Sequence, residues 1–499
     1  MRTLIQEIQN PPPPEALVEA VAGEPGRVLL RSALFDSPQA RYSFVAARPF
    51  LVFRAFGSRC EMTTLGFTRR QFGNPWRVLE GLMARFELLE EIDLPFPLGG
   101  CFGYWGYELK HFVEPRLTRR AVNDLELPDC HAGFYDSLVV FDHRLDRAWI
   151  ISTGFEPDGS RSETRAQRQV ELWQERLRMA VDATGGVPVS NERAIGPKRR
   201  PETAASSAGD AMAPGIHSNF SRDQFIDIVR RAQRYIRAGD IYQVNLAQRL
   251  SAQAAGDGWD FYRRLAGVSP APFSAWIDAG DFQLCSSSPE MFLHLSGAHV
   301  QTRPIKGTRP RSADPTRDAQ LSYELQTSPK EMAELVMITD LLRNDLGRIC
   351  EFGSVSVPEL IRLERFAQVQ HLVSTVTGRL RPEVPHFAAL ASCFPGGSVT
   401  GAPKIRAMDI IDELEPVTRG PYTGALGYLG FNRESQLSIV IRSAVCRGDA
   451  VHFHAGAGIV ADSVPEAEYE ETLAKAGGFM AALEAPGRAA EPIDRKIRS

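Results

Sequence analysis

The sequence predicts an α+β protein whose strands pair in antiparallel sheets. Short runs of strand-like composition, such as residues 27–33 and 42–46, are separated by turns rich in Asp, Ser and Pro. Longer stretches with the helical spacing of apolar residues occupy residues 329–346 and 465–483. Because strands and helices come in blocks and do not alternate one by one, antiparallel pairing is favoured over a parallel βαβ sheet.

Length, composition and charge exclude several classes of protein. The 499 residues are enough for two to four average domains or one large two-lobed unit, and 43% of them are hydrophobic, as in ordinary globular proteins. The net charge of -4 provides no basic field, so nucleic acid is not an expected partner. No apolar run approaches the roughly 18 residues needed to span a membrane, and residues 1–14 lack a signal-peptide core. We therefore expect a cytoplasmic protein.

The N-terminal region, residues 1–190, contains the first set of expected elements. Strands are expected at residues 27–33, 42–46, 50–56, 138–141 and 147–152, and helices at residues 75–86 and 161–180. Between Gly99 and Glu108, glycine alternates with aromatic residues, which is typical of backbones that approach closely against a core.

Composition divides the remainder of the chain. Residues 191–218 are dominated by Ala, Ser, Gly, Pro and charge, and we interpret them as a flexible linker. The region 219–484 opens with a capping-box pattern, Ser221 followed by Gln224, and an apolar helical stripe that ends at Gly239. Strands are then expected at residues 242–250, 273–277 and 282–286, and residues 485–499 are expected to be a disordered tail.

The seven cysteines are odd in number, widely scattered and free of any C-x-x-C motif. That distribution argues against a disulfide framework and against a structural zinc site. Cys101 matches the G-x-C-x-G elbow of class I glutaminases, but no histidine in the chain opens the His-x-Glu element that such an enzyme needs. We interpret Cys101 as a small buried residue in a glycine-rich segment.

Two predicted helices carry acids next to their apolar stripes. Glu334 directly precedes Leu335, and Glu468 and Glu471 lie three residues apart, on one side of the last helix. Carboxylates that converge from two helices suit Mg²⁺, a cation that prefers oxygen ligands and keeps several waters. The alternative is that these acids are solvated surface residues.

Two glycine-rich segments resemble nucleotide motifs without completing them. Gly456-Ala457-Gly458 follows an expected strand at residues 451–455, but no helix opens in register after it, so a dinucleotide site is weakly supported. Backbone amides there could instead form a nest for an anion. Residues 396–404 mimic a P-loop, yet Ala-Pro-Lys stands where Lys-Ser or Lys-Thr is required.

Lys306 and Arg442 are basic residues in contrasting settings. Lys306 lies in a basic run, residues 302–311, and a surface charge is the simplest interpretation. Arg442 ends an apolar strand-like run, and an arginine there could bind a carboxylate through two parallel hydrogen bonds. Tyr422 and His371 could add polar contacts, although a lone Tyr or His is more often a satisfied residue of the core or rim.

Together these segments resemble the chorismate-utilising enzymes, which include anthranilate synthase component I, aminodeoxychorismate synthase component I, and the isochorismate and salicylate synthases. The resemblance runs nearly continuously from about residue 220 to 483, with a weaker match at residues 29–32 and 41–44. Its motifs are Gly239–Leu246, Ser288–Glu290, Arg303–Thr308, Asp340–Asp345, His371–Ser374, Phe394–Lys404, Gly456–Gly458 and Ala461–Thr472. The resemblance implies a large two-lobed fold with antiparallel sheets packed face to face and helices outside.

Within this family, the residue at position 306 separates two branches. Anthranilate synthases usually have Pro-Ile-Ala-Gly-Thr, whereas aminodeoxychorismate synthases have Pro-Ile-Lys-Gly-Thr, as here. The resemblance therefore implies that Lys306 is a covalent nucleophile on the chorismate ring, which splits one difficult displacement by ammonia into two easier steps. Glu290 resembles the family's general acid, which would protonate the departing hydroxyl.

The resemblance also implies a metal and a set of substrate contacts. Glu334 and Glu471 match Mg²⁺ ligands, with Glu468 in the surrounding water shell, and the metal would hold the substrate carboxylate. The positions that match chorismate contacts are Gly307, Thr308, His371, Tyr422, Arg442, Gly456, Ala457 and Gly458.

The N-terminal part resembles the family's tryptophan pocket. The matching residues are Ser32, Arg41, Tyr42, Pro272, Phe273 and Ser274. Anthranilate synthases usually have Leu-Leu-Glu-Ser before this pocket, whereas here Arg31 replaces the acid. We therefore do not take feedback inhibition as implied, while a structural tryptophan remains compatible with the pocket.

The predicted function is amination of chorismate to 4-amino-4-deoxychorismate, on the route to p-aminobenzoate and folate, by a transaminase-type transferase. Ammonia is expected from a separate glutamine amidotransferase subunit, and aromatisation from another enzyme. Two alternatives are anthranilate synthase component I, which eliminates pyruvate in the same site, and a non-catalytic tryptophan-binding subunit. The intact set of Glu290, Lys306, Glu334 and Glu471 argues against the second alternative.

Overall fold

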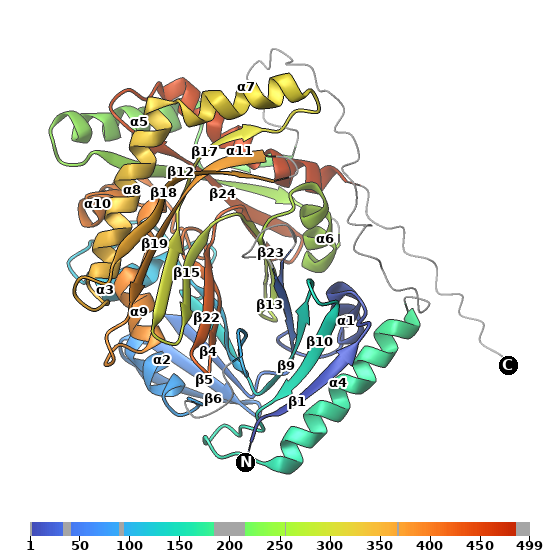
Figure 1. Ribbon diagram of the computed structural model, residues 1–499. Coiled ribbons are helices and arrows are strands. Elements are labelled where there is room, and N and C mark those ends of the chain that lie inside the picture. The colour runs from blue at the N-terminus through green and yellow to red at the C-terminus, as the bar shows by residue number, and fades with distance from the viewer. Residues whose placement is uncertain are drawn as a thin grey trace.

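Two large antiparallel sheets face each other in the computed structural model, which describes residues 2–32, 41–88, 94–183, 215–254, 256–366 and 369–485. In Figure 1 the strands β13, β9, β10 and β1 of the first sheet stand opposite β19, β15, β22 and β4 of the second. Helices lie on the outer faces of both sheets. The expected α+β class with antiparallel pairing is confirmed.

The first sheet draws its strands from both ends of the chain. Its order is β1 (Leu4–Gln9), β10 (Arg147–Ser152), β9 (Ser137–Asp142), β3 (Tyr42–Ala46), β2 (Val28–Arg31), β13 (Phe273–Asp278), β14 (Gln283–Ser288), β23 (Ser443–Arg447), β24 (Ala450–Ile459), β12 (Gln243–Gln253) and β11 (Ile216–Ser218). The short strand β20 (Gly401–Ala402) also pairs with β12.

The second sheet is built in the same way. Its order is β17 (Ile305–Pro310), β19 (Val369–Arg379), β16 (His299–Arg303), β15 (Met291–Ser296), β22 (Glu434–Ile439), β21 (Ala425–Gly430), β7 (Gly100–Trp105), β8 (Cys130–Tyr135), β4 (Leu51–Phe56), β5 (Arg59–Thr64) and β6 (Phe67–Phe72). Strand β18 (Ser356–Arg365) pairs with β19.

The helices group by the sheet face that they cover. Outside the first sheet lie α1 (Pro14–Ala20), α4 (Glu163–Ala183), α5 (Arg222–Arg237), α6 (Gly258–Val268), α10 (Lys404–Leu414) and α11 (Pro465–Glu484). Outside the second lie α2 (Pro75–Met83), α7 (Pro315–Gln326), α8 (Pro329–Gly347) and α9 (His386–Cys393). Three short helices follow other elements in the chain: η1 (Tyr107–Leu109) and α3 (Lys110–Val113) come after β7, and η3 (Gly397–Val399) comes after α9. Within the described part of the chain, no helix has the length and apolarity to cross a membrane.

The largest core fills the space between the sheets. Phe44 of the first sheet packs edge-on against Tyr428 of the second, with ring centroids 5.0 Å apart. Close approach of backbones also occurs within the second sheet, because a Cβ added to Gly103 would lie 2.1 Å from the carbonyl oxygen of His131. The alternation of glycine and aromatic residues around β7 thus reflects the predicted close approach of backbones against a core. Cys101, on the same strand, is completely buried, as expected.

Local sequence signals set the helix ends. Ser221 and Gln224 form a complete capping box at the start of α5, and the apolar stripe that follows is buried against β12 and β24. The helices expected at residues 75–86, 161–180, 329–346 and 465–483 correspond to α2, α4, α8 and α11, with ends shifted by a few residues.

The two halves of the chain share both sheets. Strand β2 pairs with β13 in the first sheet, and β7 pairs with β21 in the second. The predicted linker lies outside the described residues as far as residue 214, and its last residues form β11. Of the predicted tail, only residue 485 is described.

Candidate active site

Two neighbouring crossovers between the sheets bring Glu290 and Arg442 together. The chain leaves β14 in the first sheet and enters β15 in the second through Glu290, and it returns from β22 to β23 through Arg442. Hydrogen bonds tie the crossovers to each other: the Ser287 amide donates to the Arg442 carbonyl (2.9 Å), and the Ile439 amide donates to the Glu290 carbonyl (3.1 Å). A site at this point therefore has a rigid backbone on both sheets.

Glu290 is a buried carboxyl group with the properties of a general acid. Only 5% of its surface is exposed, and burial raises its pKa to about 7, although a hydrogen bond from Ser398 and the charge of Lys306 oppose the shift. A carboxyl group with a pKa near the working pH can hold a proton and release it during a reaction.

Lys306 reaches the same site from strand β17. Its ammonium nitrogen lies 3.3 Å from Oε2 of Glu334 on α8. A Cβ placed on Gly458 of β24 would lie 3.5 Å from that nitrogen, and the lysine also acts electrostatically on Glu290 and Glu471. The lysine predicted from one motif thus stands among residues of four separate segments.

His371 and Thr308 form one wall beside the lysine. They lie opposite each other on β19 and β17, and the Thr308 hydroxyl is 2.8 Å from His371 Nδ1. Burial lowers the pKa of His371 to about 4, so its imidazole is neutral at neutral pH, while a hydrogen bond with the Gly307 backbone opposes the shift. Gly307 has a φ of +65°, and a Cβ there would lie 2.6 Å from Leu325 Cδ1.

Arg442 provides positive charge without a compensating acid. Among the described residues, no carboxylate forms an ion pair with its guanidinium, and burial lowers its pKa. Its φ of +52° is a left-handed conformation that few non-glycine residues adopt, and such backbone strain clusters at functional sites. A buried, unpaired arginine is suited to a carboxylate ligand.

The Gly456–Gly458 segment is an extended strand and not a turn, so the predicted nest of amides is wrong. Gly456 and Gly458 lie opposite Ala247 and Asn245 in the β12–β24 ladder, whereas the pairing of β24 with β23 ends at Phe453. Glycine is required because a Cβ on residue 456 would lie 2.8 Å from the Tyr422 hydroxyl. The motif therefore places a bare strand edge close to Tyr422.

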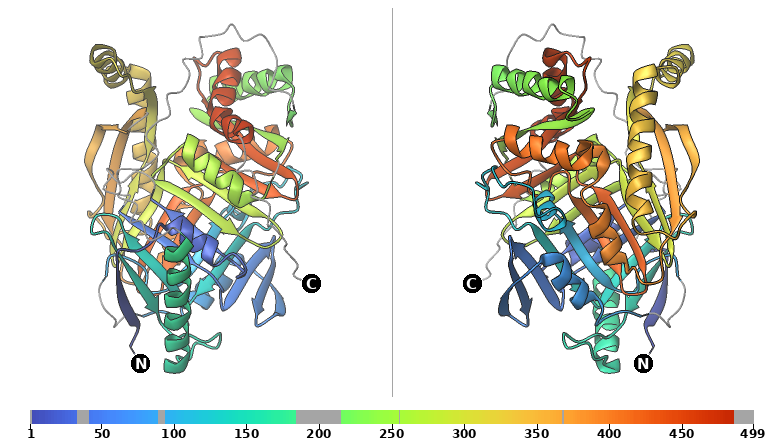
Figure 2. Two further views of the ribbon diagram at one scale, coloured as in Figure 1. Left: turned by 90° about the vertical axis from the view of Figure 1, so that its right-hand side faces the viewer. Right: turned by 90° about the vertical axis from the view of Figure 1, so that its left-hand side faces the viewer.

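The three predicted metal ligands lie in α8 and α11, which stand on opposite sides of the upper part of the molecule in Figure 2. Among the described residues, no group of three or more His, Cys, Asp or Glu is close enough to form a metal cluster. Glu471 pairs with Lys475 at 2.6 Å, and Glu468 accepts a hydrogen bond from Ser463 at 2.6 Å. Burial raises the pKa of Glu468, whereas Lys475, Lys306 and Lys330 outweigh burial at Glu471 and lower its pKa. Glu334 and Glu471, which share Lys306 as a neighbour, are a donor pair that suits Mg²⁺ with retained waters.

Sequence inspection missed two residues of the site. Lys475 also donates to the Gly456 carbonyl at 2.9 Å, and its position four residues after Glu471 on a helix was a usable signal. Ser398 bonds to Glu290 from the glycine-rich segment, and nothing in its local pattern indicated that contact.

Away from this site, a hollow of about 350 Å³, including space open to solvent, lies between the sheets and is lined by both halves of the chain. Five of the six residues predicted for the tryptophan pocket line it: Ser32, Tyr42, Pro272, Phe273 and Ser274. Arg41 does not, because its guanidinium pairs with Asp142 at 2.6 Å. Arg31 lines the hollow and pairs with Glu15 at 2.7 Å.

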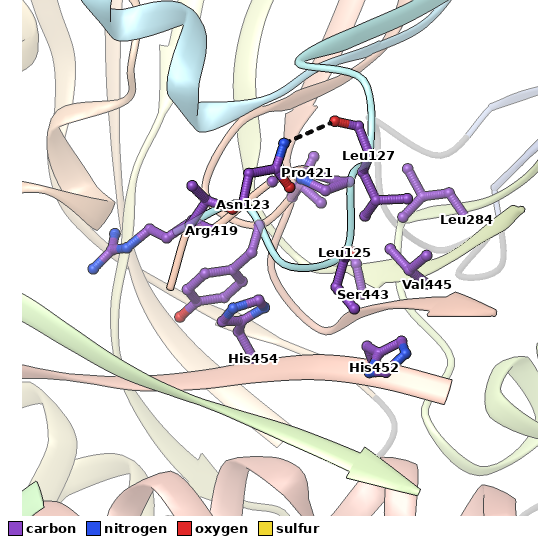
Figure 3. A pocket seen from close by; sticks show the side chains of 14 residues that line it. Asn123, Leu125, Leu127, Leu284, Arg419, Pro421, Ser443, Val445, His452 and His454 are labelled. Atoms are coloured by element: carbon purple, nitrogen blue, oxygen red, sulfur yellow. Dashed lines mark hydrogen bonds between the residues drawn. The ribbon is translucent and has the colours of Figure 1, made fainter. Parts of the chain in front are cut away.

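Another hollow, of about 400 Å³ including space open to solvent, has Tyr422 among its lining residues, and Figure 3 shows it from close by. The Tyr422 ring stacks on His454 with centroids 4.9 Å apart and planes 12° apart. Leu125 and Leu127 close the hollow on the side of the 123–127 loop. Tyr422 therefore separates two features: it lines this hollow, and its hydroxyl lies next to Gly456 on the edge of β24.

Comparisons with known proteins identify a family and solved structures that this chain resembles. The family model for chorismate binding enzymes matches residues 31–481. Anthranilate synthase component 1 of Acetivibrio thermocellus is 37% identical over 92% of this chain and 90% of its own length, and aminodeoxychorismate synthase component 1 of Klebsiella aerogenes is 37% identical over 95% and 97%. The solved structure of anthranilate synthase component I from Streptococcus pneumoniae superposes with a TM-score of 0.72 and 31% identity, covering 89% of this chain and 93% of that one.

Proposed function

This chain belongs to the chorismate binding enzyme family, and we propose that it aminates chorismate to 4-amino-4-deoxychorismate. One observation carries the choice within the family: the amine of Lys306 lies 3.3 Å from Glu334 and in electrostatic contact with Glu290. A surface lysine of a basic run would not stand between two buried or half-buried acids of different elements. Its position supports a chemical role for this side chain.

The proposed reaction proceeds in two displacements. The lone pair of the Lys306 amine forms a bond to the chorismate ring, the ring hydroxyl leaves, and Glu290 gives that hydroxyl a proton so that it departs as water. Ammonia then bonds to the ring as the lysine leaves, which yields the aminated product. Arg442 and neutral His371 stand where they can hold the substrate, the first through a carboxylate and the second through a hydrogen bond.

Two acids of the site could bind a divalent cation, although both are paired with lysines in this structure. Glu334 and Glu471 would hold Mg²⁺, with water and substrate completing its shell. When bound, the ion would offset the charge of a substrate carboxylate. Lys306 and Lys475, which pair with these acids here, would have to give up those contacts.

Ammonia and a regulatory ligand complete the proposal. Ammonia is supplied by a glutamine amidotransferase subunit, in keeping with the component 1 names of the relatives. Tryptophan occupies the 350 Å³ hollow, where its ring would lie among Tyr42, Phe273 and Tyr428. Arg31 in the wall of that hollow replaces an acid of the anthranilate branch, so the ligand's role here is structural and not inhibitory.

The test is an assay with chorismate, Mg²⁺ and excess ammonium in which products are identified by mass. The expected product is 4-amino-4-deoxychorismate. Anthranilate with pyruvate would reject this proposal in favour of the other branch that the relatives represent. A folded protein without turnover would indicate a non-catalytic, ligand-binding subunit.

A further inference from the structure

Arg419 is a buried arginine outside the predicted site residues, with only 2% of its surface exposed. Arg419 is one of the residues that line the hollow of Figure 3, and its guanidinium points away from the leucines drawn there. Every one of its N–H groups has an acceptor. The bonds run from Nε to Glu415 Oε2 (2.8 Å), from Nη1 to the Val399 carbonyl and Thr423 Oγ1 (3.2 Å each), and from Nη2 to the Asn245 carbonyl (2.8 Å) and Glu415 Oε1 (2.6 Å).

Apart from Glu415, the acceptors belong to three different segments of the candidate site. Val399 lies in the glycine-rich segment that also supplies Ser398 to Glu290. Asn245 lies on β12 directly opposite Gly458. Thr423 follows Tyr422, and the guanidinium carbon itself is 5.6 Å from the centroid of the Tyr422 ring.

The Thr423 segment needs such support. Thr423 has a φ of +59°, which is strained for a β-branched residue. Its amide bonds to the Val440 carbonyl at 2.7 Å, and its hydroxyl is oriented by Arg419. Glu415 in turn anchors the arginine, because its Oε1 also accepts the Ala247 amide of β12 at 2.9 Å.

We infer that Arg419 is a positioning residue for substrate binding: three of its five donors tie together the glycine-rich segment, the β12–β24 edge and the Tyr422 turn, and the other two bond to Glu415. The inference rests on the proposed function, since these segments are taken to contact chorismate. Arg419 touches neither Lys306 nor Glu290. Its loss should therefore weaken the binding of chorismate more than the chemical step.

The matching experiment compares Arg419→Lys with Lys110→Met. Lysine keeps the charge but has three donors in place of five, so at least two acceptors lose their bonds. Lys110→Met breaks another buried ion pair, the 2.5 Å contact with Asp412; among the described residues the Lys110 ammonium hydrogen-bonds to none of the three segments. Thr423→Val removes a single Arg419 contact and serves as a milder variant, with Thr423→Ser as the conservative rescue.

The readouts are the KM and kcat for chorismate consumption, together with Tm. Arg419→Lys is expected to raise KM about tenfold or more while kcat stays within about threefold, the signature of lost binding energy. Thr423→Val should raise KM less, Thr423→Ser should restore it, and Lys110→Met should lower Tm without changing KM. An unchanged KM in Arg419→Lys and Thr423→Val, or an equal rise in Lys110→Met, would overturn the inference. Chorismate consumption is measured whatever the product, so a failure of the proposed amination would be seen separately.

Discussion

At the scale of single residues, burial determines what the site can do. Glu290 and His371 are both buried, and burial moves their pKa values in opposite directions, because it disfavours the charged form of each. Near neutral pH the Glu290 carboxyl group is therefore about half protonated, and the His371 imidazole is neutral. Arg442, by contrast, has no ion-pair partner among the residues that the structure describes.

The raised pKa of Glu290 predicts a basic limb in the pH profile. The carboxyl group must be protonated to assist the departing hydroxyl, so kcat/KM for chorismate should be high below pH 7 and fall above about pH 7. Ser398→Ala should move this limb to higher pH, because the Ser398 hydrogen bond lowers the pKa of Glu290. The measurement is chorismate consumption at a constant concentration of unprotonated ammonia. A limb that does not move in Ser398→Ala would assign it to another group.

The second residue-scale prediction concerns the covalent step. Lys306→Ala should abolish any adduct of enzyme and substrate, because it removes the amine that forms the covalent bond, while the Lys475 amine is held by Glu471 and the Gly456 carbonyl. Lys330→Ala is the control. Lys330 is an exposed residue of α8 whose charge lowers the pKa of Glu471 and of Glu468, so the variant that lacks it should still form the adduct between enzyme and substrate. Intact-protein mass spectrometry after mixing with chorismate and Mg²⁺ in the absence of ammonia provides the readout. An adduct that survives in Lys306→Ala would assign the nucleophile elsewhere.

At the scale of elements, glycines decide how closely backbone and side chains approach. On β24 the glycines leave a strand edge open beside Tyr422 and Lys306. On α11, Gly477 has no such task, since a Cβ there would meet no atom within 4 Å. Glycine is thus required for close approach on β24 and is not required at Gly477 on the neighbouring helix α11.

This difference predicts opposite outcomes for two alanine substitutions. In Gly458→Ala the added methyl would lie 2.5 Å from Gln243 Nε2 and 3.5 Å from Lys306 Nζ, so kcat/KM should fall about tenfold or more. Gly477→Ala should raise the free energy of unfolding by up to about 1 kcal/mol, because alanine has the higher helix propensity, and should leave kcat/KM unchanged. Denaturant unfolding and chorismate kinetics measure both effects. A fully active Gly458→Ala variant would remove β24 from the site.

At the scale of the whole molecule, both sheets combine strands from the two halves of the chain. The 350 Å³ hollow reflects this, since Ser32 and Tyr42 come from the first half and Phe273, Leu426 and Tyr428 from the second. A ligand there contacts both halves at once. Its binding would stabilise the fold as a unit.

Tryptophan is therefore expected to raise Tm. A ligand that binds only the folded state at 100 times its Kd adds about 2.7 kcal/mol of stability. Thermal unfolding with and without tryptophan measures the shift, with phenylalanine as a ligand control. Phe273→Ala, which removes one wall of the hollow, should lose the shift and keep its turnover. A Tm that tryptophan does not change would leave this hollow without the proposed ligand.

The sequence by itself determined the local elements and the family. Periodicity and caps gave α5, α8 and α11, because these signals act within a few residues, and ordered motifs around Lys306 and Glu290 identified the chorismate binding enzymes. Only the tertiary structure decided that Gly456–Gly458 is a strand and not a nest of amides, because its partner strand β12 is about 210 residues away in sequence. It also decided that Ser398 bonds to Glu290 and that Arg419 bonds to three segments around the site. Glu290, the partner of Ser398, and Asn245, one partner of Arg419, lie on distant segments, and no local pattern records a contact that exists only when two sheets and their crossovers have assembled.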